Sequence, residues 1–218
     1  MSAAAQVYRP GPGIVAPFVA AKTAPEYSGE ARLAKLEGGV LLSLVVGSDG
    51  QPRDIRVARP LGLGLDEKAI EDVRTWQFRP GTRSGMPVDV RVGEEVFFRR
   101  PRDLWDWHLV RAVFRPPPGS TRPVLIQAKF PPTVDVEENA SVTIAFEVGG
   151  KGVPLHARVL KSSDPKWDRV VLRVFQAGWR FRAGSRDGQP VTAPAWFEFV
   201  RGSHSPIPAA GIPFPPEQ

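Results

Sequence analysis

The chain carries one sequence pattern twice. Residues 76–79 (Trp-Gln-Phe-Arg) are followed by residues 85–88 (Gly-Met-Pro-Val), and at an offset of 103 residues 179–182 (Trp-Arg-Phe-Arg) are followed by 188–191 (Gly-Gln-Pro-Val). Upstream matches fall at an offset of 102, so one residue is inserted between the blocks; they are Gly50 with Gly152 and Val57 with Val159. A duplication of this length indicates two copies of a domain of roughly 90 residues.

Composition is that of an ordinary globular protein with a basic surface. The net charge of +6 comes from 29 Lys and Arg interspersed with 23 Asp and Glu, and the densest basic stretch, residues 98–102, is short. This favours a solvated basic surface over a nucleic-acid interface. The absence of cysteine excludes disulfides, cysteine metal sites and a thiol nucleophile.

Nothing in the chain predicts a membrane span. No run approaches the 18 or so apolar residues of a spanning helix, and residues 1–5 lack the basic and apolar regions of a secretory signal. These observations leave the compartment open.

The first copy predicts the order helix, strand, turn, strand, helix, strand. Both faces of residues 40–46 are largely apolar, as in a central strand, and Ser48, Asp49 and Gly50 form a hairpin signal. The expected elements are a helix over 30–36 with Ser28 as N-cap, strands over 40–46 and 55–59, a helix over 65–76 and a strand over 88–98.

The second copy predicts the same order without its first helix. The expected elements are strands over 142–148 and 153–159, a helix from Pro165 to Gly178 and a strand over 193–199. Residues 130–139 read as extended. Between the copies, Trp105, Leu109 and Val113 lie at helical spacing and predict a short helix over 103–114.

These elements predict an α+β fold of two tandem domains, each a small three-stranded antiparallel sheet with one or two helices packed on one face. The expected divisions are a flexible leader over 1–20, domain 1 over 21–100, a linker over 101–120, domain 2 over 121–201 and a disordered proline-rich tail over 202–218.

No motif for catalysis, metal or cofactor binding stands out. The three histidines, His108, His156 and His204, are scattered over the linker, a strand and the tail, whereas a metal site needs convergent ligands. There is no Gly-x-Ser-x-Gly elbow and no phosphate-binding loop. We therefore expect a non-enzymatic protein without cofactor, and an enzyme stays as a hypothesis without positive support.

The first copy resembles the C-terminal domain of the TonB family of energy transducers. The matching stretches are 25–27, 30–32, 37–40, 45–46, 49–50, 65–66, 69, 76–80 and 85–88. The motif residues of the two copies are Tyr27, Gly38, Gly50, Trp76, Phe78, Pro80, Gly85, Pro87, Trp179, Phe181, Gly188 and Pro190. Ser28 stands where family members often have proline. The second copy lacks the Pro-Tyr entry and resembles a divergent TonB-like domain.

The resemblance implies a periplasmic or cell-envelope module that binds an extended peptide, such as a segment of an outer-membrane transporter, in TonB-dependent transport. The peptide would add a strand beside the last strand of a domain, here residues 88–98 and 191–200. The expected partner-binding residues are Val88, Asp89, Val90, Arg91, Val92, Glu94 and Val96. The family's membrane anchor and proline-rich spacer have no counterpart in this sequence, and we expect no nucleic-acid partner.

Several features have two interpretations. Trp76 and Trp179 either anchor helix to sheet or stack on a ligand, and Trp105 and Trp107 either pack between the domains or bind a ligand. The charges at Asp89, Arg91, Glu94 and Glu95 either prevent aggregation through the edge strand or select a partner. The alternative function is a structural or sensory envelope scaffold that self-associates through its sheet edges, for example as a homodimer.

Overall fold

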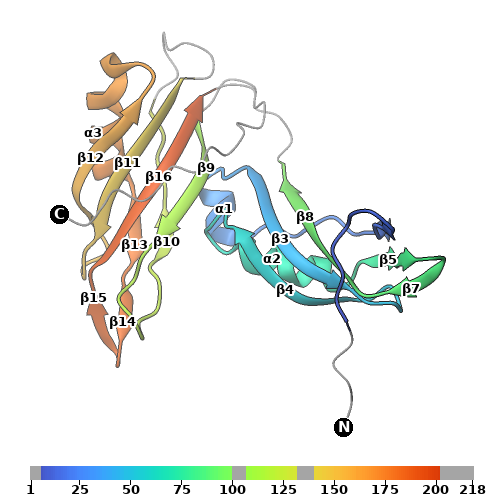
Figure 1. Cartoon of the computed structure of the whole chain (residues 1–218). Coiled ribbons are helices and arrows are strands. Elements are labelled where there is room, and N and C mark those ends of the chain that lie inside the picture. The colour runs from blue at the N-terminus through green and yellow to red at the C-terminus, as the bar shows by residue number, and fades with distance from the viewer. Residues whose placement is uncertain (1–5, 100–106, 132–139, 202–218) are drawn as a thin grey trace.

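The computed structural model describes residues 6–99, 107–131 and 140–201 of the chain. Two antiparallel sheets lie beside each other, and a helix packs on each (Figure 1). This confirms the α+β fold with two tandem domains. The predicted tail, together with Trp105 and His204, lies outside the described residues.

Domain 1 is built on a three-stranded sheet with the order β4-β3-β8. Its strands are β3 (Gly38–Val46), β4 (Pro52–Arg59) and β8 (Val90–Phe98). The central strand β3 buries alternate residues, Val40, Leu42, Leu44 and Val46, completely, and helix α2 (Leu65–Val73) packs on β3 and β4. The short helix α1 (Gly29–Leu33) begins at the predicted cap, where the Ser28 hydroxyl accepts a hydrogen bond from the Ala31 N–H at 3.0 Å.

Short strands tie the N-terminal segment to domain 1. β1 (Ile14–Val15) pairs with β6 (Gly81–Arg83), which also pairs with β7 (Met86–Val88), and β2 (Phe18–Ala21) pairs with β5 (Gln77–Arg79). The expectation of a flexible leader over 1–20 is therefore wrong for the paired residues. The prolines there separate two short strands; they do not prevent pairing.

Domain 2 repeats the sheet and adds one strand. The repeated strands are β11 (Ser141–Val148), β12 (Pro154–Ser162) and β16 (Ala193–Arg201), and the helix is α3 (Asp168–Gly178), preceded by the single turn η1 (Pro165–Trp167). β10 (Val124–Gln127) pairs with β13 (Arg180–Arg182), and β14 (Gly184–Arg186) pairs with β15 (Gln189–Val191).

The added strand is β9 (Trp107–Phe114), which gives domain 2 the order β12-β11-β16-β9. The predicted linking helix is thus wrong over these residues, and domain 2 has four strands where three were expected. The side-chain alternation of β9 changes phase at a register shift between Leu109 and Arg111, which hides the period of two from the sequence. Pairing along β16 satisfies the backbone and overrides the local helical spacing.

β9 also joins the two domains. Its Leu109 carbonyl accepts a hydrogen bond from the Glu37 N–H at 2.9 Å, and its Ala112 N–H donates to the Leu61 carbonyl at 3.0 Å. Nearby, the Arg122 guanidinium holds the Glu30 carboxylate through two contacts of 2.7 and 3.0 Å. The buried apolar residues of both domains form one continuous cluster, so the domains share a core.

The repeated glycines are explained by one close backbone approach in each copy. Gly50 and Gly152 have φ of +79° and +74°. A Cβ there would lie 2.3 Å from the Phe78 carbonyl oxygen in domain 1 and 1.8 Å from that of Phe181 in domain 2. The same glycines accept hydrogen bonds from the Phe78 and Phe181 N–H groups. Only glycine combines this φ with this approach.

The joint between the domains predicts a strong effect of Gly62→Ala. Gly62 has φ of +99°, and a Cβ there would lie 1.9 Å from the Ala112 carbonyl oxygen of β9. We expect a loss of about 2–4 kcal/mol of unfolding free energy, from backbone strain plus overpacking. Urea denaturation measures it.

Gly85→Ala is the matched control, because Gly85 has φ of +82° and open space around it. It should cost only the strain of the left-handed conformation, about 1–2 kcal/mol. Equal losses for the two variants would contradict the close packing of β9 on domain 1.

Candidate functional site

The last strand of domain 1, β8, has one side paired with β3 and the other side largely open. On the open side, Tyr8 pairs at the start of the strand: its N–H donates to the Asp89 carbonyl at 2.9 Å, and its carbonyl accepts from the Arg91 N–H at 2.8 Å. Since backbone groups of alternate residues point to the same side, the N–H and C=O groups of Gly93, Glu95 and Phe97 in β8 also face outward.

Within the described residues, no backbone partner is found for the outward groups of Gly93, Glu95 and Phe97, because Tyr8 pairs only with Asp89 and Arg91. The pairing of β3 with β8 runs from Gly38 to Val46 without a register shift, so the strand is regular. We call the outward backbone groups of Gly93, Glu95 and Phe97 the open edge. A regular, accessible edge of this kind can pair with an extended chain.

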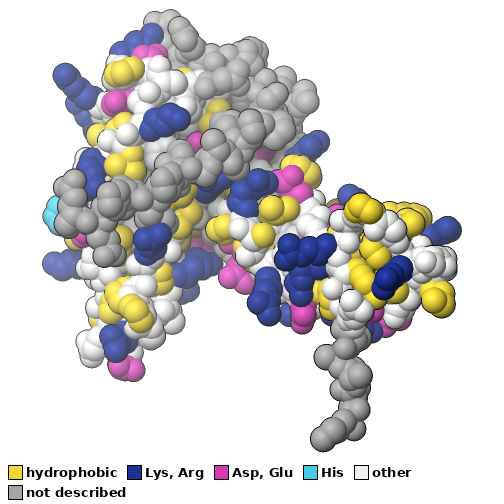
Figure 2. Space-filling view, viewed as in Figure 1, with side chains coloured by type: hydrophobic (Ala, Val, Ile, Leu, Met, Phe, Trp, Pro, Cys, Tyr) yellow, Lys and Arg dark blue, Asp and Glu magenta, His cyan; other side chains and the backbone are white. Residues whose placement is uncertain are grey.

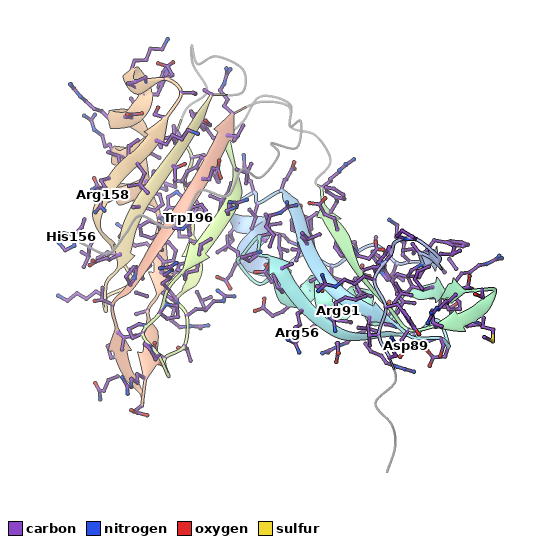
Figure 3. All side chains as sticks on the ribbon, viewed as in Figure 1. Arg56, Asp89, Arg91, His156, Arg158 and Trp196 are labelled. Carbon is purple, nitrogen blue, oxygen red and sulfur yellow. The ribbon has the colours of Figure 1, made fainter. Side chains whose placement is uncertain are left out.

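Of the other three outer strands of the two main sheets, β9 bonds to domain 1 through Leu109 and Ala112, and β4 and β12 are irregular. Asp54 in β4 and His156 in β12, which correspond in the repeat, both have positive φ, +49° and +51°. The registers of both strands are shifted, and charged residues such as Arg56 and Arg158 are exposed there (Figure 3). Bulges and charges disrupt pairing at an edge. Among the described strands, β8 is therefore the edge best suited to accept a partner.

A shallow groove borders the open edge. It is lined by Arg9, Pro10, Ala16 and Pro17 of the N-terminal segment, by 41–43 of β3, by Ala58 of β4 and by 91–94 of β8. On the visible face of domain 1, Lys and Arg side chains lie among acidic and apolar ones (Figure 2).

Glu94 is the acidic group of this groove. It lies between Val92 and Val96 on the side of β8 that faces the core, and it is opposite Leu42 of β3. Partial burial raises the pKa of its carboxyl group above the usual value of 4.5, while the charge of Lys22 acts in the opposite direction. A carboxylate on the core-facing side of an edge strand is costly to desolvate.

The opposite face of β8 carries charges that are already paired. Glu95 forms an ion pair with Arg59 of β4, and Arg91 lies 3.5 Å from Asp54. The Asp89 carboxylate accepts a hydrogen bond from the Ser48 N–H at 2.8 Å. These contacts connect β8 with β4 and with the turn that follows β3. Because the ion pairs are partly exposed to solvent, they contribute little to stability.

The corresponding edge in domain 2 is filled by the chain itself. β9 pairs antiparallel with β16, placing Phe114, Ala112 and Leu109 opposite Ala195, Phe197 and Phe199. The Phe114 ring lies 5.4 Å from that of Phe197, and on the other face the Arg111 guanidinium lies over the Trp196 ring. The expectation of a second accepting edge at residues 191–200 is therefore wrong.

The structure distributes the predicted partner-binding residues over three environments. Val88 lies in β7, paired with Gly81, and Asp89 precedes β8. Val90 and Val96 are buried. Only Arg91, Val92 and Glu94 line the groove. Sequence reasoning missed Tyr8, because it belongs to the leader expected to be flexible. It also missed Lys22, which lies just after that leader and before the first predicted helix.

The repeated tryptophans belong to the core. Trp76 and Trp179 are 3% and 1% exposed. The Trp76 indole N–H donates to the Asp72 carboxylate at 3.0 Å, and that of Trp179 donates to the Lys129 carbonyl at 2.7 Å. Such burial favours the anchoring interpretation over ligand stacking. Trp107 is likewise buried, in β9.

No helix in the described part of the chain is long and apolar enough to cross a bilayer. No group of three or more His, Asp or Glu residues there could hold a metal ion.

The sequence model of the family described as Gram-negative bacterial TonB protein C-terminal matches residues 23–99 and 133–200. The chain belongs to this family. Its two matched segments agree with two tandem copies. Protein tonB2 of Pseudomonas aeruginosa is 35% identical over 77 residues, which are 35% of this chain and 28% of that protein. The chain thus matches less than a third of that relative's length. Membership of the family supports a protein-interaction role.

The environment of Glu94 predicts that its charge opposes folding. Because its pKa is raised in the folded state, the ionised carboxylate costs stability above pH 4.5, and the cost disappears when both states are protonated. Glu94→Gln should therefore increase the unfolding free energy at pH 7, and the gain should shrink as the pH falls below the usual glutamate range. Urea denaturation at a series of pH values measures this.

Glu95→Gln provides the matched control, since it removes the same charge from the neighbouring residue. It breaks the ion pair with Arg59, so it should leave stability at pH 7 unchanged or slightly lower. A loss of stability in Glu94→Gln would show that the Glu94 carboxylate makes a stabilising contact, contrary to this account.

Proposed function

We propose that this chain is a non-enzymatic, periplasmic protein-interaction module that binds one extended segment of a protein partner by strand addition at the open edge of β8. The observation that carries the proposal is the regular run of outward backbone groups at Gly93, Glu95 and Phe97, beside a groove. Main-chain hydrogen bonds supply affinity in this binding mode, and alternate side chains supply specificity.

The chain provides its own example of such an addition. β9 lies on the last strand of domain 2 in the position that a partner would take on domain 1. This supports a stoichiometry of one segment per chain, with domain 2 as a scaffold. Residues Val90, Arg91, Val92, Glu94 and Val96 then form the binding strand, with Val88 and Asp89 at its entrance.

Membership of the TonB family supports an outer-membrane transporter as the partner and TonB-dependent transport as the process. The cell envelope is then the location. The alternative function, a scaffold that self-associates, requires pairing between edges of two chains. The bulges in β4 and β12 act against it, which leaves contact between two β8 strands as the route to a homodimer.

The open edge predicts that Gly93→Pro abolishes peptide binding. Proline removes the outward N–H, and its ring obstructs the approach of a partner strand. NMR titration with peptides from candidate transporters should shift the amides of β8 in the native protein and leave this variant unresponsive, whereas amides of β9 and β16 should stay unshifted in both.

Gly93→Ala is the matched control, because a Cβ at this position would meet Leu41 and Leu42 only at ordinary contact distance, 3.8 Å. It keeps the N–H and should bind as the native protein does. Unshifted β8 amides in the native protein would contradict strand addition. A dimer that appears with increasing concentration in light scattering, and that Gly93→Pro disrupts, would favour the scaffold instead.

A further inference from the structure

The duplication supplies an internal template for what a strand on the open edge must satisfy. At an offset of 103 residues, Val92, Glu94 and Val96 of β8 correspond to Ala195, Phe197 and Phe199 of β16. The central strands agree with this alignment, because Leu42 lies opposite Glu94 and Ile144 opposite Phe197. The two edges can therefore be compared residue by residue.

In domain 2 the contact between the edge and the added strand is apolar. β9 turns Leu109, Ala112 and Phe114 toward the core side; Leu109 and Ala112 are buried, and Phe114 packs against the core. They lie opposite Phe199, Phe197 and Ala195. A strand added at this edge thus buries alternate side chains against the core-facing residues of the last strand.

In domain 1 the central position of the same row carries a charge. Glu94 stands at the position that Phe197 has in domain 2, and Val92 and Val96 lie two residues before and after it on the same face. In the described part of the chain, no hydrogen bond or ion pair to the Glu94 carboxylate is found. Lys22 is the cation that acts on it, and its amino group lies over the Trp76 ring, 5.4 Å from the centroid. An added strand would bury this carboxylate further, which is costly unless the strand brings an opposite charge.

We propose that Glu94 is a specificity-determining residue, which selects segments with Lys or Arg opposite it and an apolar residue two positions away on each side. This inference rests on the strand addition proposed above. Opposite charges directly across two strands attract, and like charges repel. The pattern is symmetrical about its centre, so it holds for parallel and antiparallel addition alike.

The test uses three synthetic peptides with two valines flanking a central residue, each separated from it by one serine. The central residue is Lys, Leu or Glu, and dissociation constants come from the shifts of β8 amides. We expect the Lys peptide to bind about tenfold more tightly than the Glu peptide at low salt, with a smaller ratio at high salt. General attraction to a chain of net charge +6 would favour the Glu peptide instead.

Matched variants assign the preference to one carboxylate. Glu94→Gln should reduce the ratio to about twofold or less, and Glu94→Lys should reverse it. Glu95→Gln removes the same charge from the other face of the strand and should leave the ratio unchanged. Thermal unfolding shows whether each variant is folded. If Glu94→Lys does not fold, the near-isosteric variants Glu94→Gln and Glu95→Gln decide whether Glu94 sets the preference.

Each remaining outcome is decisive. If all three peptides shift the β8 amides with equal affinity, strand addition stands and the role of Glu94 is overturned. If Glu95→Gln removes the preference, selection lies on the opposite face and the role of Glu94 is again overturned. If no peptide shifts these amides, both the inference and the proposed function fail.

Discussion

The structure depends on the pairing of β9 with the last strand of domain 2. β9 pairs with β16 along one side and forms hydrogen bonds with Leu61 and Glu37 of domain 1 along the other. One segment therefore closes the edge of domain 2, joins the two domains and extends the shared core. Because the unpaired backbone groups of a sheet edge can pair with another extended chain, this pairing also makes the two copies unequal. The edge of β16 is filled, whereas among the described residues its counterpart on β8 is paired only with Tyr8.

The copies share the residues that the backbone and the core require, and they differ along the edges of their sheets. Gly50 and Gly152 recur because a carbonyl oxygen lies where their Cβ would be. The repeated tryptophans are buried members of the shared core. At the edges, by contrast, buried Phe197 corresponds to half-buried Glu94. Domain 1 thus carries a charged residue where domain 2 carries a buried aromatic one, at the position where a partner strand would be added. A residue that costs stability there is expected to serve binding.

The sequence was sufficient for the elements with strong periodicity. The central strand, both main helices and the repeated turns follow from alternation, capping and glycine positions, and Ser28 caps its helix as expected. The strand β9 could not be predicted, because its register shift breaks the alternation and its pairing comes from a strand some eighty residues away in sequence. For the same reason the sequence could not show which edge is open. The role of Tyr8 was hidden, since a single bridge leaves no periodic pattern.

Amide hydrogen exchange tests the inequality of the two edges most directly. Trp196 and Glu198 of β16 correspond to Gly93 and Glu95 of β8, and in each pair the N–H points away from the central strand. We predict slow exchange at Trp196 and Glu198, where β9 pairs, and fast exchange at Gly93 and Glu95. Equal protection at the corresponding positions, or fast exchange along β9 and β16, would contradict this prediction.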